Sequence, residues 1–343
     1  MNYILKDENA VYYECGFSCD NEIFLKFGSE SFFLTDARYL TEAKELIKDT
    51  QVLLMDRRDP FRAARELIRK SGIKSLVYNP LEWSVDEFES LNSKLSIHFK
   101  KSINFSQKKR IIKSEFELDI LRKAANLGAK AFEDFAKFIT KNGLGMSEKR
   151  LFNEAENIFK NYGELELSFS PIVALNQNAA KPHALPTDKE LQRDSLLLLD
   201  AGVKYERYCS DRTRTAQITD KMNFSKKEAK FKEKKKQKIY DIVLKAQEAS
   251  LKRARAGVSA SEIDRAGREV IEKAGYGNYF IHSTGHGVGL DIHELPVIGV
   301  RSKDTIEENM VFTIEPGIYL PGEFGVRIED TVIAKTDGVE VIG

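Results

Sequence analysis

The chain has 343 residues, with 54 lysines and arginines against 53 aspartates and glutamates, and 42% of its residues are hydrophobic. This length and apolar content predict two domains, or one large domain, with substantial cores, and they exclude wholesale disorder. The formal net charge of +1 argues against a dedicated nucleic-acid binder, whose domain is usually strongly basic.

No segment approaches the roughly 18 apolar residues of a membrane-spanning helix, and the longest aliphatic run covers only residues 196–199. The first residues lack the basic-then-apolar pattern of a signal peptide, which argues against secretion by that route. The cysteines, Cys15, Cys19 and Cys209, fit neither a disulfide framework nor a paired zinc site. We therefore expect a soluble, cytoplasmic protein with reduced thiols and no membrane partner.

The first hundred residues alternate short apolar runs with amphipathic stretches. Apolar runs typical of strands cover residues 22–27, 31–34, 51–55 and 75–78. Helical periodicity is found between them, at residues 39–48 and 61–70. This alternation predicts an α/β domain with a central sheet over residues 1–108, and a basic, polar segment at residues 106–113 is expected to connect it to a second domain.

The second domain, residues 109–343, is expected to open with a helix. Ser114 and Glu117 are spaced as a capping box, and apolar residues follow at helical intervals. Ser259 and Glu262 have the same spacing and predict the start of another helix. We expect further helices at residues 147–161 and 235–255. Strand patterns prevail from residue 196 onward, so the predicted fold class of this domain is α+β.

A lysine-rich segment at residues 221–238 contains nine lysines, with Phe224 and Phe231 between them. Basic residues interleaved with aromatic rings are found in proteins that bind single-stranded nucleic acid. Charge runs are more often solvated faces, and Glu228 and Glu233 offer partners at helical spacing. We therefore predict a solvated loop that leads into an exposed helix face.

Three histidines lie in the segment HSTGHGVGLDIHE, namely His282, His286 and His293. The alternate glycines of this segment disfavour a helix and predict a strand or turn whose backbone approaches another part of the molecule. A lone histidine is usually a satisfied polar residue, as we expect for His98. Three within twelve residues indicate a site, although the spacing is not that of an HExxH zinc protease.

Two carboxylates follow a strongly apolar run. Asp200 ends the run SLLLLDAG, and Asp211 follows eleven residues later. If these segments form a hairpin that turns at residues 205–206, the two carboxylates lie roughly opposite each other, where like charges are destabilising. A bound cation would reverse this penalty, and so would an arginine, for which Arg212 and Arg214 are the candidates.

A second pair of carboxylates repeats this arrangement. Glu315 follows a short apolar run, Glu329 lies in VRIEDT, and the turn signal Pro-Gly at residues 321–322 separates them. Arg327 would share the face of Glu329 because alternate residues of a strand point the same way. Four carboxylates with one imidazole suit two divalent ions, and oxygen-rich ligation favours manganese or cobalt without excluding zinc. Two metals about 3.5–4 Å apart can activate a shared water for hydrolysis.

The order Asp200, Asp211, His286, Glu315, Glu329 resembles the metallopeptidase family of methionyl aminopeptidases, aminopeptidase P and prolidase, which share the pita-bread fold. The segments LLLLDAGVKYERYCSDRTRT, HSTGHGVGLDIHE, FTIEPGIYLPG and VRIEDT are similar to its signature segments. The resemblance covers the whole second domain. It implies a pita-bread catalytic domain, preceded by a smaller α/β domain similar to the N-terminal domain of creatinase and prolidase.

The resemblance also implies roles for these residues. Asp200 would bind one metal, Asp211 and Glu329 would bridge both, and His286 and Glu315 would bind the other. The nucleophile would be a water that bridges the two metals, and Glu315 resembles the proton-accepting carboxylate of the family. The implied cofactor is a pair of divalent ions, with manganese favoured and cobalt or zinc as alternatives.

Within the family, the sequence is similar to the proline-specific branch. His183 in KPHALPT, His282, His293 and Arg327 match residues of that branch, so the implied catalytic set comprises these four with Glu315. The segment TDARYLTEA resembles the N-terminal domain that simple methionyl aminopeptidases lack. That domain implies a homodimer.

The predicted function is therefore hydrolysis of the Xaa-Pro bond at peptide N-termini, by an Xaa-Pro aminopeptidase acting on peptides with proline in second position. The alternative is an Xaa-Pro dipeptidase, because the compact length resembles small prokaryotic prolidases, and the sequence does not show whether the site closes beyond the proline. A methionyl aminopeptidase and a metal-free binding protein on the same fold are disfavoured, because the N-terminal domain would be unexplained and no ligand position is missing.

Overall fold

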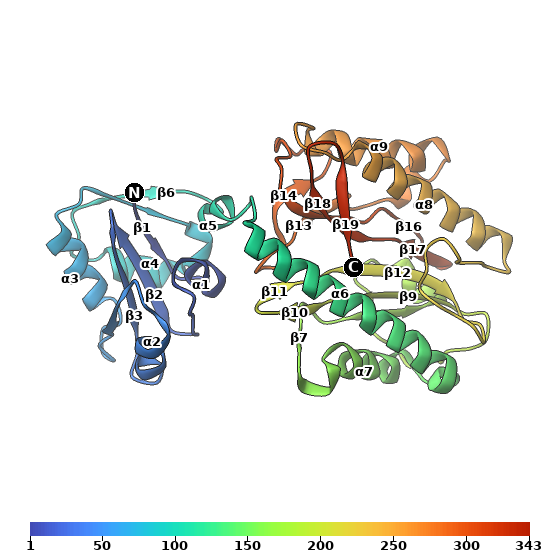
Figure 1. Cartoon of the computed structure of the whole chain (residues 1–343), viewed down its shortest axis with the longest axis horizontal. Helices are drawn as coiled ribbons and strands as arrows, with labels where there is room; N and C mark the ends of the chain where they lie inside the picture. The colour runs from blue at the N-terminus through green and yellow to red at the C-terminus, as the bar shows by residue number, and fades with distance from the viewer. The chain divides into compact units, whose positions relative to one another are not determined.

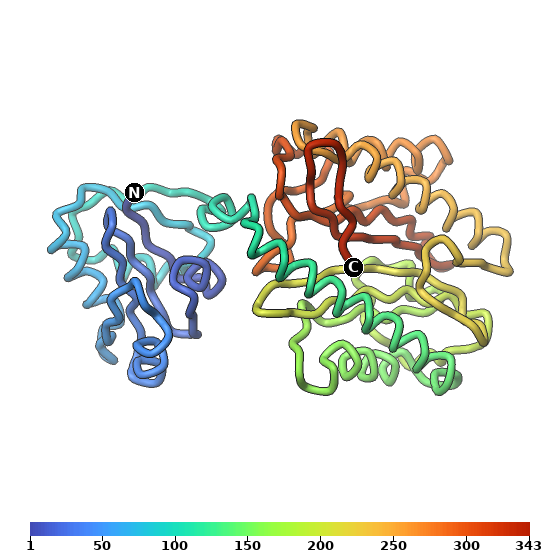
Figure 2. Tube along the Cα trace, viewed as in Figure 1, coloured from blue at the N-terminus to red at the C-terminus, as the bar shows by residue number.

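The computed structural model describes residues 1–343, and the chain divides into two compact units, Met1–Arg110 and Ile111–Gly343. Figure 1 labels many of the helices and strands of each unit, and Figure 2 follows the backbone from end to end. None of the helices combines the length and the apolar composition needed to span a membrane.

The first unit is a six-stranded mixed sheet between two layers of helices. Its strands, in sheet order, are β4 (Gln51–Leu54), β3 (Glu30–Thr35), β2 (Glu22–Phe27), β1 (Asn2–Leu5), β5 (Ser75–Tyr78) and β6 (His98–Lys101). Its helices are α1 (Glu8–Cys15), α2 (Leu40–Leu46), α3 (Arg62–Ser71), α4 (Val85–Asn92) and α5 (Phe105–Lys109). Neighbouring residues of β1 face opposite cores, since Ile4 packs with residues of α3 and α4, and Leu5 with residues of α1 and α2. The α/β arrangement predicted for this part of the chain is confirmed.

The second unit contains four antiparallel sheets, and each of its two main sheets is covered by a pair of helices (Figure 1). The three-stranded sheet has the order β12 (Arg212–Gln217), β9 (Leu196–Ala201), β8 (Ile172–Leu175), and the five-stranded sheet has the order β14 (Glu294–Ile298), β13 (Gly285–Gly287), β15 (Val311–Ile314), β18 (Asp330–Ala334), β19 (Val339–Ile342). Smaller sheets are formed by β11 (Tyr208–Cys209), β10 (Val203–Tyr205) and β7 (Glu166–Leu167), and by β16 (Gly317–Leu320) and β17 (Phe324–Arg327).

Four long helices cover these sheets: α6 (Glu115–Phe138), α7 (Glu148–Phe159), α8 (Lys234–Arg253) and α9 (Ala260–Lys273). Residues of α6 and α7 share one apolar core with β8, β9 and β12. Residues of α9 share another with β14, β15 and β18, and α8 packs between α9 and the hairpin β16–β17. This is the α+β architecture that the sequence predicted.

One of the two predicted capping boxes is present. Ser114 accepts the N–H of Glu117, whose carboxylate in turn accepts the N–H of Ser114, so α6 begins as expected. The prediction for α9 is wrong in this detail. The hydroxyl of Ser259 pairs with that of Ser261 at 2.8 Å, and the carboxylate of Glu262 binds Arg253 instead of the helix start.

The segment at residues 106–113 ends in a buried charge. The ammonium of Lys113 lies 3.0 Å from Oε2 of Glu294, and the two side chains are 1% and 0% exposed. Oε1 of Glu294 accepts the N–H of Asp291, so this carboxylate also shapes the turn that precedes His293. The connection predicted from its polar composition therefore contributes a fully buried ion pair to the second unit.

The lysine-rich segment is less uniformly solvated than predicted. Lys226 binds the buried carboxylate of Asp330, and Phe231 is buried against the core of α8. Lys236 does pair with Glu233 on the helix surface, whereas Glu228 accepts a bond from Asn223 and pairs with no lysine. The prediction of a solvated loop is therefore wrong in part, because the ion pair of Lys226 and the buried ring of Phe231 hold this loop against the protein.

Candidate active site and metal-binding residues

The hairpin of β9 and β12 carries Asp200 and Asp211. Its register pairs Asp200 with Thr213, so Asp211 lies two residues before the position opposite Asp200 and shares its face of the sheet. The predicted direct opposition of the two carboxylates is wrong. The chain turns at Glu206 and Arg207, which both have positive φ, as in the two-residue turns that match strand twist. This turn lies one residue later than the predicted one and shifts the register by two.

The second carboxylate pair has the predicted register. Gly317 pairs with Arg327 in β16–β17, and Ile314 pairs with Asp330 in β15–β18. Continuing either register places residue 315 opposite residue 329. The two glutamates therefore lie where one pair of strands passes into the next, with their side chains toward the same space.

Glycines of the histidine segment allow β13 to lie very close to its neighbours. A Cβ on Gly285 would lie 1.9 Å from the carbonyl oxygen of Thr313, and one on Gly287 would lie 2.1 Å from that of Leu295. Only glycine fits at such distances. The N–H of His286, between the two glycines, donates to the Thr313 hydroxyl at 3.2 Å, which fixes the strand that carries the imidazole.

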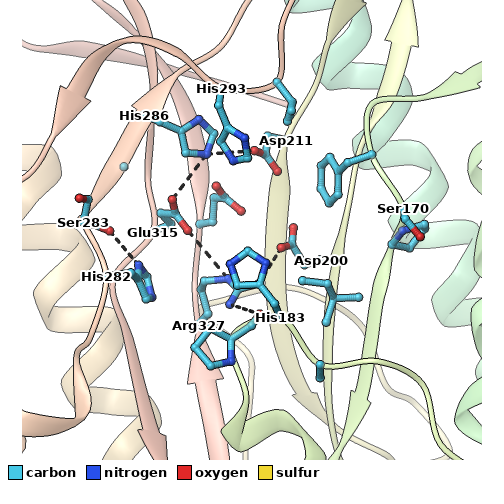
Figure 3. Close-up of a pocket in the computed structure, with 18 of the residues that line it drawn as sticks. Ser170, His183, Asp200, Asp211, His282, Ser283, His286, His293, Glu315 and Arg327 are labelled. Carbon is cyan, nitrogen blue, oxygen red and sulfur yellow. Dashed lines mark hydrogen bonds and ion pairs between the residues drawn. The ribbon is translucent and has the colours of Figure 1, made fainter. Parts of the chain in front are cut away.

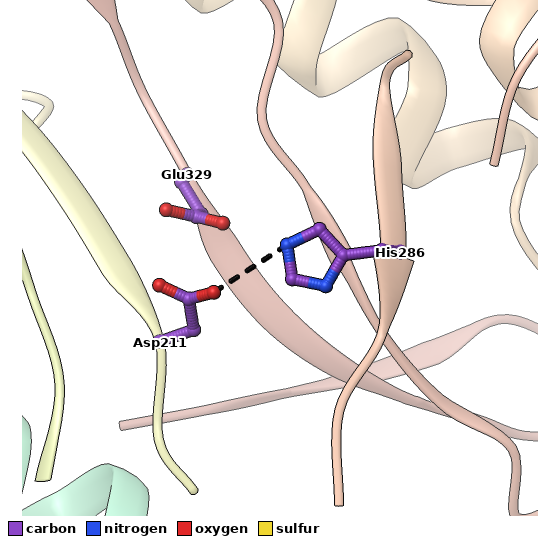
Figure 4. A group of neighbouring side chains, drawn as sticks. All are labelled: Asp211, His286 and Glu329. Atoms are coloured by element: carbon purple, nitrogen blue, oxygen red, sulfur yellow. Dashed lines mark ion pairs between the residues drawn. The ribbon is translucent and has the colours of Figure 1, made fainter. Parts of the chain in front are cut away.

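Three of the predicted metal ligands converge closely. One ligand atom each of Asp211, His286 and Glu329 lies within 4.8 Å of the others (Figure 4). Nε2 of His286 lies 3.5 Å from Oδ2 of Asp211 and 3.5 Å from Oε1 of Glu315. Asp200 lines the same cavity (Figure 3), as does Glu329, so all five predicted ligands border one space.

Arg327 links these carboxylates. Its guanidinium lies 2.6 Å from Oδ2 of Asp200 and 4.0 Å from Oε2 of Glu315. The arginines considered from the sequence are not the partners of Asp200: Arg214 binds Asp330 at 2.6 Å, and Arg212 donates to an oxygen of Gly343. Alternation along the strand explains this, because residues 212 and 214 point to the opposite side of β12 from Asp211.

Burial and mutual repulsion perturb the acids of this cluster. Burial and the neighbouring Glu329 raise the pKa values of Asp211 and Glu315 well above their ordinary range. Burial, with Asp200 close by, raises the pKa of Glu329 to about 8. Four carboxylates here face one guanidinium, so the folded chain concentrates negative charge at this point.

The imidazole of His286 is oriented to accept a cation. Its Nδ1 lies 3.1 Å from the carbonyl oxygen of Gly287, which can only accept, so Nδ1 carries the proton and the lone pair of Nε2 faces the acids. Burial, with His293 beside it, lowers the pKa of His286 to about 4. The ring is therefore neutral at pH 7, as a metal ligand must be.

The donor set fits a divalent cation. Oδ1 of Asp200 is buried and has no hydrogen-bond partner, although its other oxygen binds Arg327. A buried carboxylate oxygen without a partner costs free energy that a bound cation would offset. Oxygen donors with a single imidazole suit hard or borderline divalent ions such as manganese.

The cluster lies in a cavity of about 640 Å³, a size typical of small-ligand sites (Figure 3). His183, His282 and His293 all line it, so the structure brings together every site residue predicted from the sequence. The His293 ring lies edge-on to that of His286, with centroids 4.3 Å apart. Phe169, Pro171 and Ile172 add an apolar wall that the sequence analysis did not identify.

Tyr319 is a site residue that the sequence analysis missed. Its hydroxyl lies 2.8 Å from Nε2 of His282 and accepts a bond of 2.8 Å from Arg327. Since Nδ1 of His282 donates to the carbonyl oxygen of Ser283, both ring nitrogens of His282 have partners within the chain. Tyr319 lies four residues after Glu315, and alternation along a strand could have placed it on the same face.

A buried brace on α9 holds the segment that carries the histidines. Asp264 accepts the N–H and the hydroxyl of Thr284 at 3.1 and 2.8 Å and forms two bonds with Arg268. Arg268 in turn donates to the carbonyl oxygens of Phe280 and His282 at 3.0 and 2.7 Å. These bonds fix the backbone on the N-terminal side of β13.

Comparison with solved structures finds the same architecture across the whole chain. An Xaa-Pro dipeptidase from Bacillus anthracis superposes with a TM-score of 0.90 at 32% identity, covering 99% of this chain and 92% of that one. An X-Pro aminopeptidase from Thermotoga maritima gives 0.86 at 31% identity, with 99% and 94% covered. A prolidase from Pyrococcus furiosus gives 0.85 at 33% identity, with 99% and 95% covered. The predicted pita-bread architecture is confirmed.

Comparison with known sequences gives a matching result. The sequence profile described as metallopeptidase family M24 matches residues 119–336. An uncharacterized peptidase of Staphylococcus epidermidis is 42% identical over 233 residues, which are 68% of this chain. The match spans 62% of that relative, less than two thirds of its length.

Proposed function

Because this chain belongs to metallopeptidase family M24, we propose that it hydrolyses the bond between the first residue of a peptide and a proline in second position. The observation that carries the proposal is the gathering of His183, His282 and His293 around the carboxylate–imidazole cluster in one cavity. Solved structures named as Xaa-Pro dipeptidase, X-Pro aminopeptidase and prolidase share this fold at 31–33% identity and support the same substrate class.

We propose that Asp200, Asp211, His286, Glu315 and Glu329 hold two divalent ions, with Asp211 and Glu329 shared between them. When bound, two such ions supply an activated water and polarise the bond that it attacks. The unpartnered oxygen of Asp200 and the raised pKa values of the clustered acids support this assignment. Manganese is the favoured metal and cobalt or zinc the alternatives, because the donors are mainly oxygens.

The chain's own groups would divide the proton transfers. Glu315, partly exposed to the cavity, would accept a proton from the attacking water. His293 and His183 are exposed in the same cavity and would give a proton to the leaving prolyl nitrogen. Arg327, held by Asp200 and Tyr319, would steady the negative charge that develops on the carbonyl oxygen.

The chemistry of proline suits such a site. An Xaa-Pro bond is a tertiary amide without an N–H, and the proline ring fixes the backbone. A peptidase that binds its substrate as an added β-strand loses a hydrogen bond at this position. A pocket that holds the ring against Phe169, Pro171 and Ile172 has no need of that N–H.

The proposal predicts cleavage of Ala-Pro-Ala and Ala-Pro after the alanine by protein loaded with manganese. We expect a chelator to abolish hydrolysis and Ala-Ala-Ala to be resistant, which release of free alanine would measure. If the metal-loaded protein cleaves neither proline peptide, the Xaa-Pro assignment is wrong.

The second candidate function is an Xaa-Pro dipeptidase, favoured by the TM-score of 0.90 to the dipeptidase from Bacillus anthracis. The same assay separates the two candidates. Cleavage of Ala-Pro-Ala supports the aminopeptidase, whereas cleavage of Ala-Pro alone supports the dipeptidase.

Replacement of His293 by alanine is expected to lower kcat about 10²–10⁴-fold, the usual contribution of a general acid, while bound metal stays unchanged. Replacement of His282 by alanine should also lower kcat. Tyr319→Phe should reproduce much of that loss, because the Tyr319 hydroxyl is the hydrogen-bond partner of Nε2 of His282. His98→Ala is the matched control, since His98 is exposed on β6 of the first unit. Full activity of His293→Ala at full metal content would remove His293 from the proposal.

Further properties are proposed from the family resemblance. We propose a homodimer and a cytoplasmic location, and we propose that residues 1–108 and 109–343 are two domains, of which the second is catalytic. The compact units of the structure, Met1–Arg110 and Ile111–Gly343, support that division.

A further inference from the structure

Glu148, the first residue of α7, is a fully buried acid outside the carboxylate cluster. Its two oxygens accept four hydrogen bonds, from the N–H of Leu175 at 2.6 Å, from Nδ2 of Asn178 at 2.8 Å, and from the N–H and the hydroxyl of Thr187 at 2.7 and 2.6 Å. Three of these donors are N–H groups, which cannot accept, so the set suits an ionised carboxylate. Glu148 therefore binds its partners through charge-assisted hydrogen bonds, with no lysine or arginine among them.

All four donors belong to one segment, residues 175–187, which carries His183 into the cavity of the carboxylate cluster (Figure 3). After the short helical turn Asn176–Ala180, this part of the chain contains no helix or strand until β9. Its conformation therefore depends on contacts with other elements. Leu175 and Thr187 lie on either side of His183 in the sequence, so one carboxylate binds the segment at both of its ends.

The imidazole of His183 is positioned by its backbone. The side chain is exposed in the cavity, and no hydrogen bond within the chain holds the ring. The main chain beside it is held on both sides. Nη1 of Arg327 donates to the carbonyl oxygen of Pro182 at 3.3 Å, and Nδ2 of Asn178 donates to that of Leu185 at 2.9 Å. Whatever fixes this segment therefore fixes the place of the ring.

The first turn of α7 binds the same segment through its backbone. The N–H of Glu148 donates to the carbonyl oxygen of Lys189 at 2.9 Å, and the N–H of Lys149 donates to that of Thr187 at 3.2 Å. First-turn N–H groups have no partner within their own helix, and the helix dipole favours a negative charge at this end. Residues of α7 also belong to the apolar core of β8 and β9. The start of α7 is therefore a rigid support for the segment.

We propose that Glu148 is a positioning residue, which places the imidazole of His183 where the leaving prolyl nitrogen takes up a proton. The inference rests on the proposed function, in which His183 and His293 supply that proton. Glu148 does not line the cavity and bonds to none of the proposed metal ligands, so it acts through residues 175–187 alone. A misplacement of the ring by about 1 Å would cost up to ~10²-fold in rate.

The test is a double-mutant cycle of Glu148→Gln and His183→Ala, assayed on whichever of Ala-Pro-Ala and Ala-Pro the parent cleaves. Glutamine keeps the size of the side chain but turns an N–H₂ group toward the donors of the segment. We expect Glu148→Gln alone to lower kcat about 10–10²-fold, with little change in KM and in bound manganese. In the His183→Ala background it should lower kcat by less than about twofold, because residues that act as one unit are not additive. Equal losses in the two backgrounds would overturn the proposal.

Glu117→Gln is the matched control. Glu117 is likewise buried in the first turn of a helix of the second unit, and it accepts bonds from Ser114 and Tyr208, outside the segment of His183. This variant should lose stability and keep its kcat, and a loss of kcat equal to that of Glu148→Gln would overturn the proposal. If Glu148→Gln does not fold, Thr187→Val removes a single donor and should lower kcat several-fold in the parent but not in His183→Ala.

Hydrogen exchange and NMR of the metal-free protein test the placement without catalysis. In Glu148→Gln, the amides of Leu175 and Thr187 should exchange at least about tenfold faster, and the ring resonances of His183 should shift while those of His98 do not. Unchanged exchange and unchanged resonances would overturn the proposal. A parent that cleaves neither proline peptide would refute the proposed function, whereas an active parent with equal losses in both backgrounds would refute this inference alone.

Discussion

Replacing Asp211 by asparagine is expected to lower Xaa-Pro hydrolysis at least ~10³-fold and to reduce bound metal sharply, because the proposal makes this carboxylate a ligand shared by two ions. The same change should stabilise the metal-free protein. Burial and the neighbouring Glu329 disfavour the ionised form of Asp211, and a neutral amide of similar shape avoids this penalty. Denaturant unfolding, with metal and with chelator, measures both effects.

The pH dependence of stability has a definite sign in this experiment. The pKa of Asp211 is higher in the folded state than in the unfolded state, so protonation of this group favours folding. The metal-free parent should therefore become more stable as the pH falls from above the folded pKa toward the ordinary pKa of an aspartate. Asp211→Asn should lose this part of the pH dependence. The exposed Asp188→Asn, at a side chain 84% exposed, is the control and should keep both metal and activity. Undiminished metal content in Asp211→Asn would contradict the ligand assignment.

Replacing Lys113 by methionine is expected to destabilise the second unit by ~3–5 kcal/mol, the usual cost of removing one partner of a buried ion pair. Glu294 cannot reach water, since its side chain is 0% exposed. Adding Glu294→Gln should restore part of the loss, because the remaining amide carries no charge. Urea unfolding of the two single variants and the double variant measures the coupling.

Lys149→Met is the matched control for this ion pair. Lys149 pairs with Asp188 at 2.9 Å, but the two side chains are 57% and 84% exposed, so the change should cost less than about 1 kcal/mol. A loss for Lys113→Met no larger than that for Lys149→Met would show that the buried pair contributes little. Activity should fall with stability, because Glu294 directly follows His293 and its carboxylate shapes the turn before that histidine.

Elements with strong periodicity were predictable from the sequence. The apolar runs at residues 22–27 and 75–78 became β2 and β5 with the same bounds, and the capping box of Ser114 marked the start of α6. β6 was missed, because His98–Lys101 has one apolar residue and becomes a strand by pairing with β5. Tertiary pairing of this kind leaves little trace in a local pattern.

The site residues were easier to predict than their partners. Residue types and spacing identified Asp200 and Asp211, but the register depended on a turn whose positive-φ residues, Glu206 and Arg207, carry no glycine or asparagine signal. The arginine that binds Asp200 is 127 residues away, and spacing along one strand says nothing about such a contact. Alternation from Glu315 could have placed Tyr319 on the face of the site, but its contact with His282, 37 residues earlier in the chain, leaves no local signal.

Arg327 makes the candidate site rigid before any metal ion binds. Its guanidinium binds Asp200, Thr213, Tyr319 and the carbonyl oxygen of Pro182, so protein groups already hold it from several sides. A cation would then meet donors whose conformational entropy was lost during folding and not during binding. The site is therefore preformed, in contrast to that of a zinc finger, which folds only around its metal. We therefore expect the metal-free chain to be folded and to become active when divalent ions are added, with no further folding step.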